Sequence, residues 1–294
     1  MRIELAMKKL SRVGIIANLE KEESPEIVKQ VLTLASHHGW SCLSETATAA
    51  CGLPDTVRVL QNPETLAHEV DLLLVIGGDG TMLRVARRVA GLGVPLLGIK
   101  TGRLGFLTQI TSGEINTAFE KLKAGEFDLE KRSLLAGSGK IGSEDIREVA
   151  LNDFVISRAI KSRIIELDVR VDDQFVARYL CDGLIISTPT GSTAYSLASG
   201  GGIITPNANV FSITPICPHS FQNRTVVVND CSTISVSVLS EKLQTILAAD
   251  GQKHFALNTG DSISFMRSER TISLIHFKGT SFFNTLREKL HWAN

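Results

Sequence analysis

The first residues with the types and spacing that chemistry requires stand at positions 77–81, which read Gly-Gly-Asp-Gly-Thr. The run before them, Leu72 to Ile76, is entirely apolar, and the residues after Thr81 have helical spacing. Asp79 therefore stands on a glycine turn between the carboxyl end of a buried strand and the amino end of a helix. Glycines let the backbone approach a ligand, and the N–H groups at a helix start attract phosphate. A carboxylate is unfavourable there unless it takes a proton or works beside a metal, so this turn is a candidate functional site.

A purely structural explanation of the turn remains open. Asp-Gly is among the commonest tight turns, and most junctions of this kind bind nothing. The turn is not a Walker A loop, because that motif has a lysine directly after its second conserved glycine. The nearest pair of glycines with the required spacing, Gly93 and Gly98, is followed by Ile99.

A dense run of hydroxyl side chains at residues 187–196 is the second cluster. It includes Tyr195, follows an apolar strand and precedes the triplet Gly200–Gly202. Hydroxyls and exposed backbone amides suit a polar, poly-hydroxylated ligand, and the ring of Tyr195 suits stacking. Asn152 and Asp153 add an amide and a carboxylate with which a ribose diol could be held. A surface loop or a helix cap is the alternative for the run, and a simple turn is the alternative for Asn-Asp.

Alternating strands and helices must position the first cluster. This alternation predicts right-handed crossovers and a parallel sheet, in which ligands bind outside the carboxyl ends of the strands. Asp79 stands at such an end. The expected strands are 13–17, 56–60, 72–76 and 95–99, and the expected helices are 25–35, 64–69 and 82–90.

The character of the sequence changes near residue 106. One amphipathic helix is expected at 112–124, and from Ser133 onward short strands separated by turns predict a second, mostly β domain. The turn of a predicted hairpin is formed by Asp172, Asp173 and Gln174. A strand at 271–277 and a helix at 282–292 come last. The other strands expected in the second domain are 149–157, 164–171, 175–180, 183–187, 225–228, 234–239 and 245–248.

Composition argues against several classes of protein. The chain has 294 residues, of which 43% are hydrophobic and 21% charged, as in an ordinary globular protein with a sizeable core. Lys and Arg together number 31, as do Asp and Glu, so nothing indicates a nucleic-acid or anionic-membrane partner. No segment reaches the roughly 18 apolar residues of a membrane span, and we recognise no signal peptide.

The cysteines indicate a reducing compartment. Their number is odd, they are scattered, and they form no CxxC pattern. We therefore expect a cytoplasmic protein with five buried thiols and no metal or disulfide framework. They are Cys42, Cys51, Cys181, Cys217 and Cys231.

Taken in chain order, the motifs resemble those of NAD kinases, and the resemblance covers nearly the whole sequence. Diacylglycerol kinases, sphingosine kinases and 6-phosphofructokinases carry relatives of the glycine–aspartate loop, so that loop alone is less specific. The run from Thr188 to Ser196 is highly specific to NAD kinases. The matching segments are Gly77–Thr81, Gly102–Phe106, Asn152-Asp153, Asp182-Gly183 and Thr188–Ser196.

The resemblance implies a role for each matching residue. Asp79 is implied to accept the proton of the adenosine 2′-hydroxyl, and Asp182 to lie near the nicotinamide. Asn152 and Asp153 are implied to hold the NAD ribose, and further NAD contacts are implied for Gly80, Arg163 and Gln252. The strip that binds adenine and ribose is implied to be Thr193, Ala194, Tyr195, Ser196, Leu197 and Ala198. The phosphates of the donor are expected at Gly77, Gly78, Gly80, Thr81 and Arg84.

The resemblance also implies how the molecule is organised. An α/β nucleotide-binding domain at 1–106 is expected to join a β-rich NAD-binding domain at 107–274, with the active site between them and the tail 275–294 packed back on the first domain. The implied reaction transfers the terminal phosphate of ATP, or of a donor such as polyphosphate, to the 2′-hydroxyl of NAD. Mg²⁺ or another divalent cation is implied with ATP, and no protein metal site is predicted. Assembly as a homodimer or homotetramer is implied.

Four residues depart from the family pattern. Lys100 stands where Asn is usual, Leu180 where a basic residue is frequent, Asp153 where Glu is usual, and Gly202 where proline is common. None of them is Asp79, so they affect substrate preference more than chemistry. An ionised Asp182 facing the positive nicotinamide predicts a preference for NAD⁺ over NADH, with Arg178 as its nearest basic neighbour in sequence.

Two other functions compete with this interpretation. A lipid kinase of the diacylglycerol or sphingosine type would share the Asp79 loop but would need a broad apolar pocket, whereas this sequence supplies the polar run 188–196. A non-catalytic NAD-binding sensor could do without the chemistry of Asp79, so the intact loop argues against it. An assay of NADP⁺ formation from NAD⁺ with each donor separates these hypotheses.

Overall fold

In the computed structural model, the apolar run before the glycine loop forms a central strand of a parallel sheet, as its composition predicts. This strand, β4 (Leu72–Gly77), pairs with β1 (Arg12–Ala17) on one side and with β5 (Pro95–Lys100) on the other. Every residue of β4 is buried. The structure describes residues 10–102, 105–142, 144–159, 164–220, 224–240 and 245–292.

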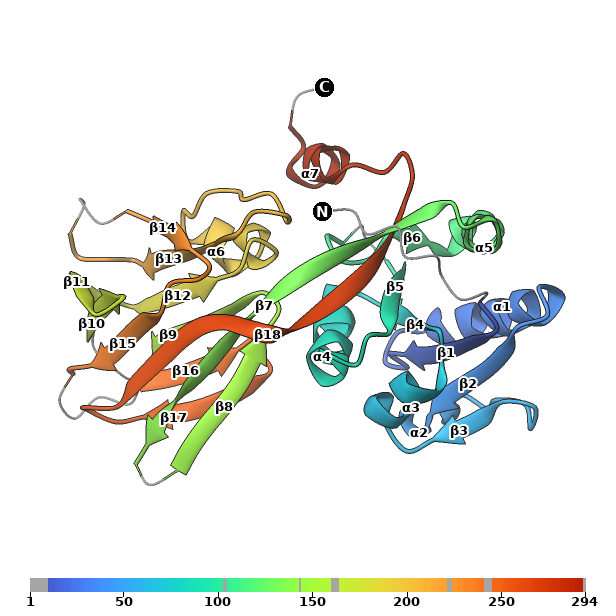
Figure 1. Cartoon of the computed structure of the whole chain (residues 1–294), viewed down its shortest axis with the longest axis horizontal. Helices are drawn as coiled ribbons and strands as arrows, with labels where there is room; N and C mark the ends of the chain where they lie inside the picture. Colours follow the sequence, from blue (N-terminus) through green and yellow to red (C-terminus); the bar gives the residue numbers. More distant parts are fainter. Residues whose placement is uncertain are drawn as a thin grey trace. The chain divides into compact units, whose positions relative to one another are not determined.

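Helices cover both faces of this sheet (Figure 1). On one face, α1 (Ser24–His37) and α5 (Ile115–Ala124) share a hydrophobic core with alternate residues of β1, β4 and β5. On the other face, Leu66 of α3 (Pro63–Glu69) and Met82 of α4 (Asp79–Val89) lie against Gly14 and Gly98. The sheet continues through β2 (Ser41–Glu45) and β3 (Arg58–Leu60), and the short elements α2 (Thr46–Ala49), β6 (Ile110–Thr111) and η1 (Ser112–Glu114) complete this part.

The chain divides into two compact units at a different place from the one predicted. The first unit comprises residues 1–131 and 271–294, and the second comprises residues 132–270. The predicted boundary near residue 106 is therefore wrong. The boundary lies later because α5 belongs to the first unit: its Ile115, Phe119 and Leu122 are buried in the core of the parallel sheet. Ile275 and Phe277 lie in the same core, and α7 (Phe282–Leu290) follows them.

Two long strands cross the sequence positions at which the chain divides. They are β7 (Phe127–Ile141) and β18 (Ser262–Phe277), which pair with each other. The sequence patterns predicted no strand at 127–141 and only residues 271–277 of β18. Charged residues interrupt both strands, for example Lys131 and Glu269, and these residues are exposed. A strand with a mixed pattern of this kind lacks the alternation from which strands are recognised.

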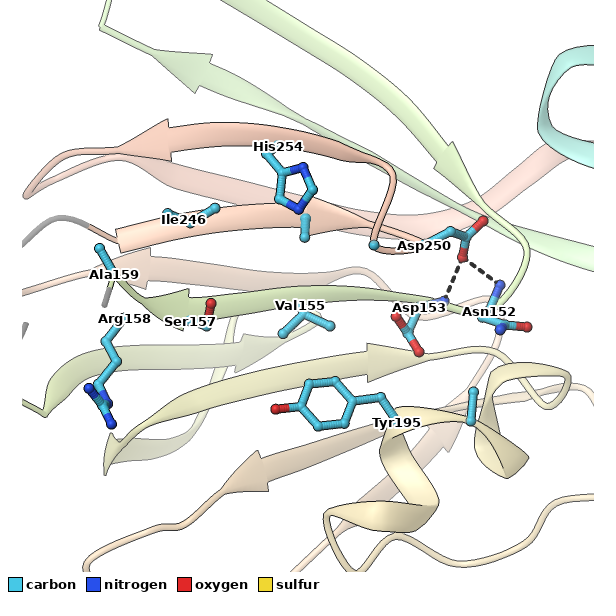
Figure 2. A pocket seen from close by; sticks show the side chains of 13 residues that line it. Asn152, Asp153, Val155, Ser157, Arg158, Ala159, Tyr195, Ile246, Asp250 and His254 are labelled. Atoms are coloured by element: carbon cyan, nitrogen blue, oxygen red, sulfur yellow. Dashed lines mark hydrogen bonds between the residues drawn. The ribbon is translucent and has the colours of Figure 1, made fainter. Parts of the chain in front are cut away.

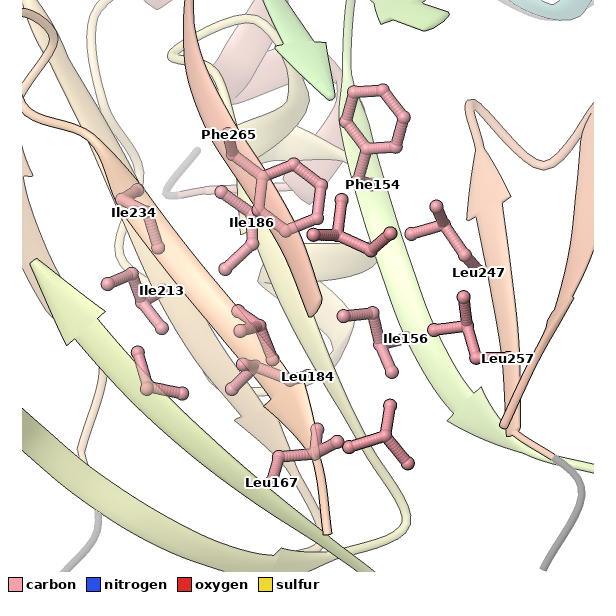
Figure 3. Close-up of a cluster of buried hydrophobic side chains, with 14 of the residues drawn as sticks. Phe154, Ile156, Leu167, Leu184, Ile186, Ile213, Ile234, Leu247, Leu257 and Phe265 are labelled. Atoms are coloured by element: carbon pink, nitrogen blue, oxygen red, sulfur yellow. The ribbon is translucent and has the colours of Figure 1, made fainter. Parts of the chain in front are cut away.

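The second unit consists of antiparallel strands in two layers, and its core lies between them (Figure 3). One layer has the order β14-β13-β12-β9-β16-β17, and in the other β11, β10, β15 and β18 are neighbours in that order. Phe154 of β9 and Phe265 of β18 meet in the core with ring centroids 5.1 Å apart. The strands are β8 (Glu144–Ala150), β9 (Asp153–Arg158), β10 (Ile165–Val171), β11 (Gln174–Cys181), β12 (Gly183–Ser187), β13 (Val210–Ile216), β14 (Val226–Asn229), β15 (Ile234–Val238), β16 (Thr245–Ala249) and β17 (Lys253–Leu257).

The fold class is confirmed, with an α/β unit built on a parallel sheet and a mostly β unit. The predicted hairpin turn is also confirmed at Asp172 and Asp173, which have positive φ between β10 and β11, whereas Gln174 already belongs to β11. The single strand predicted at 149–157 is wrong, because the chain leaves β8 at Ala150 and starts β9 at Asp153. Five of the described strands were not predicted, namely β2, β6, β7, β13 and β17.

The cysteines differ from the expectation in part. All five lie in the described part of the chain as free thiols, but Cys217 and Cys231 are exposed and only Cys181 is fully buried. Burial raises the pKa of the Cys181 thiol to about 12. None of the described helices is long and apolar enough to cross a membrane.

Candidate functional site

The predicted site residues fall into two clusters, one in each unit, and the first surrounds Asp79. Gly78 caps α4, and Asp79 is the first residue of that helix, where a negative charge is favoured by the free N–H groups. Gly77 must be glycine, because a Cβ there would lie 2.5 Å from the Thr81 hydroxyl. Gly80 is exposed, whereas Gly77 and Thr81 are buried. Of the loop residues predicted to bind donor phosphate, Gly78 and Gly80 have space beside them, because nothing lies within 4 Å of a Cβ placed on either residue.

The backbone of residues 105–107 wraps around the Asp79 carboxylate. Phe106 N donates to Oδ2 at 2.8 Å, and Leu107 N donates to Oδ1 at 3.0 Å. Gly105 approaches so closely that a Cβ would lie 2.0 Å from Asp79 Oδ1. These contacts hold the carboxylate in one orientation. They also give a local reason for the glycine in the segment after β5, where the sequence resembles the family at Gly102–Phe106.

Two lysines bring positive charge to this carboxylate. The ammonium group of Lys289, from α7, lies 3.9 Å from Asp79 Oδ2 and 4.6 Å from the centre of the Phe106 ring. Lys100 is the register partner of Gly77 and is only 7% exposed. Burial, together with the nearby charge of Lys289, lowers the pKa of Lys100, and the carboxylates of Asp79 and Glu114 oppose this shift. Lys289 was not predicted as a site residue, and nothing in its helical sequence marked it.

The arginines of α4 have different surroundings. Arg88 makes a bidentate ion pair with Glu64, with distances of 2.6 and 2.5 Å. Arg84, predicted to contact the donor, is exposed. Its charge acts on Glu45 at the end of β2, where burial raises the pKa of the Glu45 carboxyl and Arg84 opposes the rise. Arg84 is thus at the same edge of the sheet as the glycine loop.

The second cluster lines a cavity of about 530 Å³ in the second unit (Figure 2). This volume lies within the range that is usual for small-molecule sites. Strands β9 and β16 form its floor. After η2 (Gly191–Thr193) the chain contributes Ala194 and then Tyr195, the first residue of the short helix α6 (Tyr195–Ala198). The remaining lining residues are Asn152, Asp153, Val155, Ser157, Arg158, Ala159, Ile246, Ala248, Asp250, Gly251 and His254.

Asp153 is a buried acid of this cavity with a strongly raised pKa. It starts β9 and is 5% exposed, and Figure 2 shows its carboxyl group on the side of the cavity toward Tyr195. Burial, and then the nearby charge of Asp250, raises the pKa of the Asp153 carboxyl from 3.8 to about 7. A carboxyl group of this kind takes up a proton near neutral pH and can then donate as well as accept a hydrogen bond.

Asp250 holds the segment before β9 in place, which sequence reasoning missed. Its carboxylate accepts N–H bonds from Leu151 at 2.9 Å, from Asn152 at 2.8 Å and from Asp153 at 3.1 Å. Two of these bonds are visible in Figure 2. Asp250 has a φ of 49°, and Gly251 follows it. The recurrence of Asp-Gly at this position was the available signal, but nothing in the sequence links it to residues 151–153.

Arg158 and Asp182 form an ion pair beside the cavity. Arg158 Nε donates to Asp182 Oδ1 at 2.7 Å, and of the two residues only Arg158 lines the cavity. The expected neighbour, Arg178, instead lies 3.7 Å from both Glu166 and Asp168. Arg158 therefore compensates part of the Asp182 charge that would attract a positive nicotinamide, and the preference for NAD⁺ over NADH stays a prediction.

Most hydroxyls of the run 187–196 stabilise the loop rather than face a ligand, contrary to the expectation. Thr188 Oγ1 donates to the Leu151 carbonyl at 2.6 Å, and Ser192 Oγ donates to the Pro189 carbonyl at 2.7 Å. Ser196 is fully buried and bonds Thr214 at 3.0 Å, so its side chain does not reach the cavity. Tyr195, by contrast, is 47% exposed and lies along the cavity wall. The hydroxyls are needed because they satisfy backbone groups of a buried turn.

The other residues of the predicted NAD-binding set lie around this turn or outside it. Thr193 and Leu197 are half-buried and Ala198 is exposed, and none of the three lines the cavity. Gln252 is exposed on the turn after Asp250 and does not line it either. Arg163 lies outside the described residues, as do Arg103 and Leu104 of the motif after β5. Within the described ranges, no three His, Cys, Asp or Glu side chains are grouped so as to hold a metal ion.

Both units of the chain are similar to domains of known proteins. Residues 13–127 match the family model of the ATP-NAD kinase N-terminal domain, and residues 151–277 match that of the ATP-NAD kinase C-terminal domain. An NAD kinase of Caldanaerobacter subterraneus subsp. tengcongensis is 38% identical over 96% of this chain and 99% of its own length. An NAD kinase of Thiobacillus denitrificans is 42% identical over 96% of this chain and 97% of its own.

Two solved structures share the fold over almost the whole chain. The yeast NADH kinase complexed with NADH has a TM-score of 0.88 and 25% identity, covering 98% of this chain and 89% of its own. An NAD kinase from Archaeoglobus fulgidus in complex with ATP has a TM-score of 0.76 and 25% identity, covering 96% of this chain and 100% of its own.

Proposed function

This chain belongs to the NAD kinase family, and from that premise we propose that it phosphorylates the 2′-hydroxyl of the adenosine ribose of NAD with ATP as donor. The observation that carries the proposal is the Asp79 carboxylate, held at the start of α4 by two backbone N–H groups at 2.8 and 3.0 Å. Phosphoryl transfer depends on positioning and charge more than on covalent chemistry. A fixed acid on a glycine loop meets that need.

We assign to Asp79 the alignment of the attacking hydroxyl and the acceptance of its proton. Each carboxylate oxygen accepts one backbone N–H bond, and each has a further lone pair for the substrate hydroxyl. Carboxylates are weak bases, so the proton is expected to transfer late, as the new P–O bond forms. Because the N–H bonds fix both oxygens beforehand, no reorganisation is needed when the hydroxyl arrives.

The cavity of the second unit is the proposed site of the nucleoside part of NAD. Tyr195 offers a half-exposed ring for stacking, and Asn152 and Asp153 offer an amide and a carboxyl group for ribose hydroxyls. Arg158 supplies a positive charge in the same cavity, and Asp182 fixes its orientation. Asp182 acts on NAD through Arg158 in this proposal.

The donor phosphates are proposed to lie in the space beside Gly78 and Gly80, where a Cβ on either residue would meet nothing within 4 Å. The predicted Mg²⁺ has no cage of protein ligands in the described ranges, and Lys289 lies 3.9 Å from the one carboxylate of the loop. These residues do not fit a metal held by the protein. A divalent ion bound to the phosphates of the donor is compatible with them, and no catalytic step is derived through it.

The competing functions are less well supported. A lipid kinase would need a broad apolar cavity, whereas this cavity contains two aspartates, an arginine and a histidine. A sensor without activity would not need the fixed carboxylate of Asp79. A cytoplasmic location and assembly as a homodimer or homotetramer remain predictions of the sequence.

Substitution of Asp79 tests the proposed function. The purified protein with Mg²⁺, NAD⁺ and ATP should form NADP⁺, and Asp79→Asn should fold but lose roughly 10²- to 10⁴-fold in kcat. The matched control is Asp55→Asn, an exposed aspartate of the same unit, which should retain wild-type activity. Polyphosphate in place of ATP identifies the preferred donor. An Asp79→Asn variant within a few-fold of wild type would exclude Asp79 as the catalytic base.

A further inference from the structure

The surroundings of Asp79 contain more positive charge than the carboxylate needs. Lys289 lies 3.9 Å from Asp79 Oδ2 with its side chain only 27% exposed, and Lys100 is 7% exposed at the end of the adjacent strand. Both lysines act electrostatically on one another. The other acid that acts on Lys100, Glu114, is exposed and accepts hydrogen bonds from Thr111 N and Thr111 Oγ1 at 2.8 and 2.7 Å.

Two buried hydroxyls in this neighbourhood have no hydrogen-bond partner among the described residues. Thr101 Oγ1 and Thr108 Oγ1 make no hydrogen bond within the described part of the chain, although the two residues are only 9% and 4% exposed. Thr108 Oγ1 and Asp79 Oδ1 both lie within 2.5 Å of the point where a Cβ would stand on Gly105. Thr101 follows Lys100 directly, and its N–H donates to the Gly77 carbonyl at 3.3 Å. Buried polar atoms usually have partners, so these two indicate a ligand that the protein alone does not supply.

We propose that Lys100 and Lys289, with the hydroxyls of Thr101 and Thr108, form the subsite for the terminal phosphate of the donor, directly beside Asp79. This inference rests on the proposed kinase function, and it assigns to two lysines the charge neutralisation which that function requires. It also resolves the difficulty of a carboxylate at an anion site, since the chain itself supplies the compensating cations. Two ammonium groups favour an anion over a metal ion at this position.

The two lysines make no covalent bond in the reaction. The 2′-oxygen of NAD forms a bond to the terminal phosphorus, the bond from that phosphorus to the bridging oxygen breaks, and the shortened donor leaves with the electron pair. The proton of the hydroxyl passes to Asp79. Lys100 and Lys289 bind the non-bridging oxygens of the phosphoryl group that is transferred. Such charge-assisted hydrogen bonds are stronger than hydrogen bonds between neutral groups.

The experiment measures donor binding and donor kinetics separately in the full-length protein. In Lys289→Met and in Lys100→Asn, the Kd of tripolyphosphate and the Kd of a non-hydrolysable ATP analogue, both by calorimetry, should rise roughly 10- to 100-fold. The KM for the donor should rise with them, while the KM for NAD⁺ stays within two-fold. Lys289→Arg should retain most of the affinity that Lys289→Met loses. Lys278→Met, at an exposed position, should leave the Kd values and the KM for the donor unchanged.

Three results would overturn the proposal. The first is an unchanged Kd for tripolyphosphate in both variants, which would mean that the lysines only hold Asp79. The second is a loss of affinity for the ATP analogue alone, which would place the lysines on the nucleoside. The third is a rise confined to the KM for NAD⁺. Failure of the kinase function is distinguishable, because wild-type protein would then bind tripolyphosphate without forming NADP⁺. Unchanged urea unfolding of each variant shows that folding is intact.

Discussion

At the scale of single residues, the position of Asp79 depends on the lack of a side chain at Gly105 as much as on its hydrogen bonds. Gly105 brings the backbone so close that the N–H groups of Phe106 and Leu107 reach both carboxylate oxygens. The space that a methyl group would occupy is taken by Asp79 Oδ1 at 2.0 Å and Thr108 Oγ1 at 2.5 Å. Such contacts are too short for any side chain, so Asp79 would have to move.

We therefore expect Gly105→Ala to inactivate the protein without unfolding it. A displacement of about 1 Å in a catalytic group can cost roughly 10²-fold in rate, and kcat should fall by at least that factor. The control is Gly113→Ala, where a Cβ meets nothing within 4 Å. Circular dichroism and steady-state kinetics of both variants make the comparison. A fully active Gly105→Ala variant would contradict the importance of the Asp79 orientation.

Tyr195 provides a second test at this scale, on the acceptor side. Tyr195→Ala removes the exposed ring of the cavity wall, and loss of stacking should cost about 1 to 3 kcal/mol of NAD⁺ binding. The KM for NAD⁺ should rise accordingly, with the KM for ATP nearly unchanged. Phe175→Ala, an exposed aromatic residue that does not line the cavity, is the control. A rise in the KM for ATP alone would mean that the cavity does not bind the acceptor.

At the scale of elements, the start of β9 illustrates how one side chain positions a strand. Residues 151–153 leave β8 and enter β9 with their N–H groups directed at the Asp250 carboxylate, which lies on the turn between β16 and β17. From the other side, Thr188 N and Ser187 Oγ donate to the Asn152 carbonyl at 2.9 and 3.3 Å. Two remote turns thus fix Asn152 and Asp153 at the cavity.

Asp250→Asn should loosen this arrangement. An amide nitrogen would replace one carboxylate oxygen and oppose a backbone N–H, which should cost about 1 to 3 kcal/mol of unfolding free energy. Asn tolerates the positive φ of this position, so backbone strain does not contribute. The control is Asp172→Asn, whose carboxylate accepts one such bond, from Thr233 N, on an exposed turn. Urea denaturation of the two variants should show a clear loss only for Asp250→Asn.

At the scale of the whole molecule, the protonation of one buried group is linked to the stability of the fold. The pKa of Asp153 is raised from 3.8 to about 7 by burial and by Asp250. The folded chain therefore binds a proton between these pH values that the unfolded chain has released. The free energy of unfolding falls as pH rises through this window, by at most about 1.4 kcal/mol per pH unit, and levels off above the folded pKa.

Asp153→Asn should remove this dependence. The variant should be more stable than wild type at pH 8, and the difference should shrink steadily as the pH falls toward 5. Urea denaturation at unit intervals from pH 5 to pH 8 measures it, and subtraction of the two proteins cancels groups that titrate in both. A difference in unfolding free energy that does not change with pH would show that Asp153 is ionised throughout the range.

Local patterns in the sequence were sufficient where a side chain's surroundings come from its own neighbours in the chain. The apolar strand β4, the helix after it and the paired aspartates of the 172–173 turn follow from periodicity and turn chemistry. The family resemblance placed Asp79 and Tyr195 in a site for the same reason, because their motifs are contiguous. The mixed strands β7 and β18 lay beyond such patterns, since their pairing is with distant segments.

The sequence by itself determined the fold class, the family and the identity of the acid on the glycine loop. Only the tertiary structure decided which charges surround that acid, because Lys289 and Lys100 reach it from α7 and β5. It likewise decided that Asp182 is paired with Arg158, that Asp250 holds residues 151–153, and that most of the hydroxyl run is structural. Contacts between segments far apart in the chain depend on packing. Burial then sets the energy of each charge. Neither these contacts nor the burial can be read from the spacing of residues along the chain.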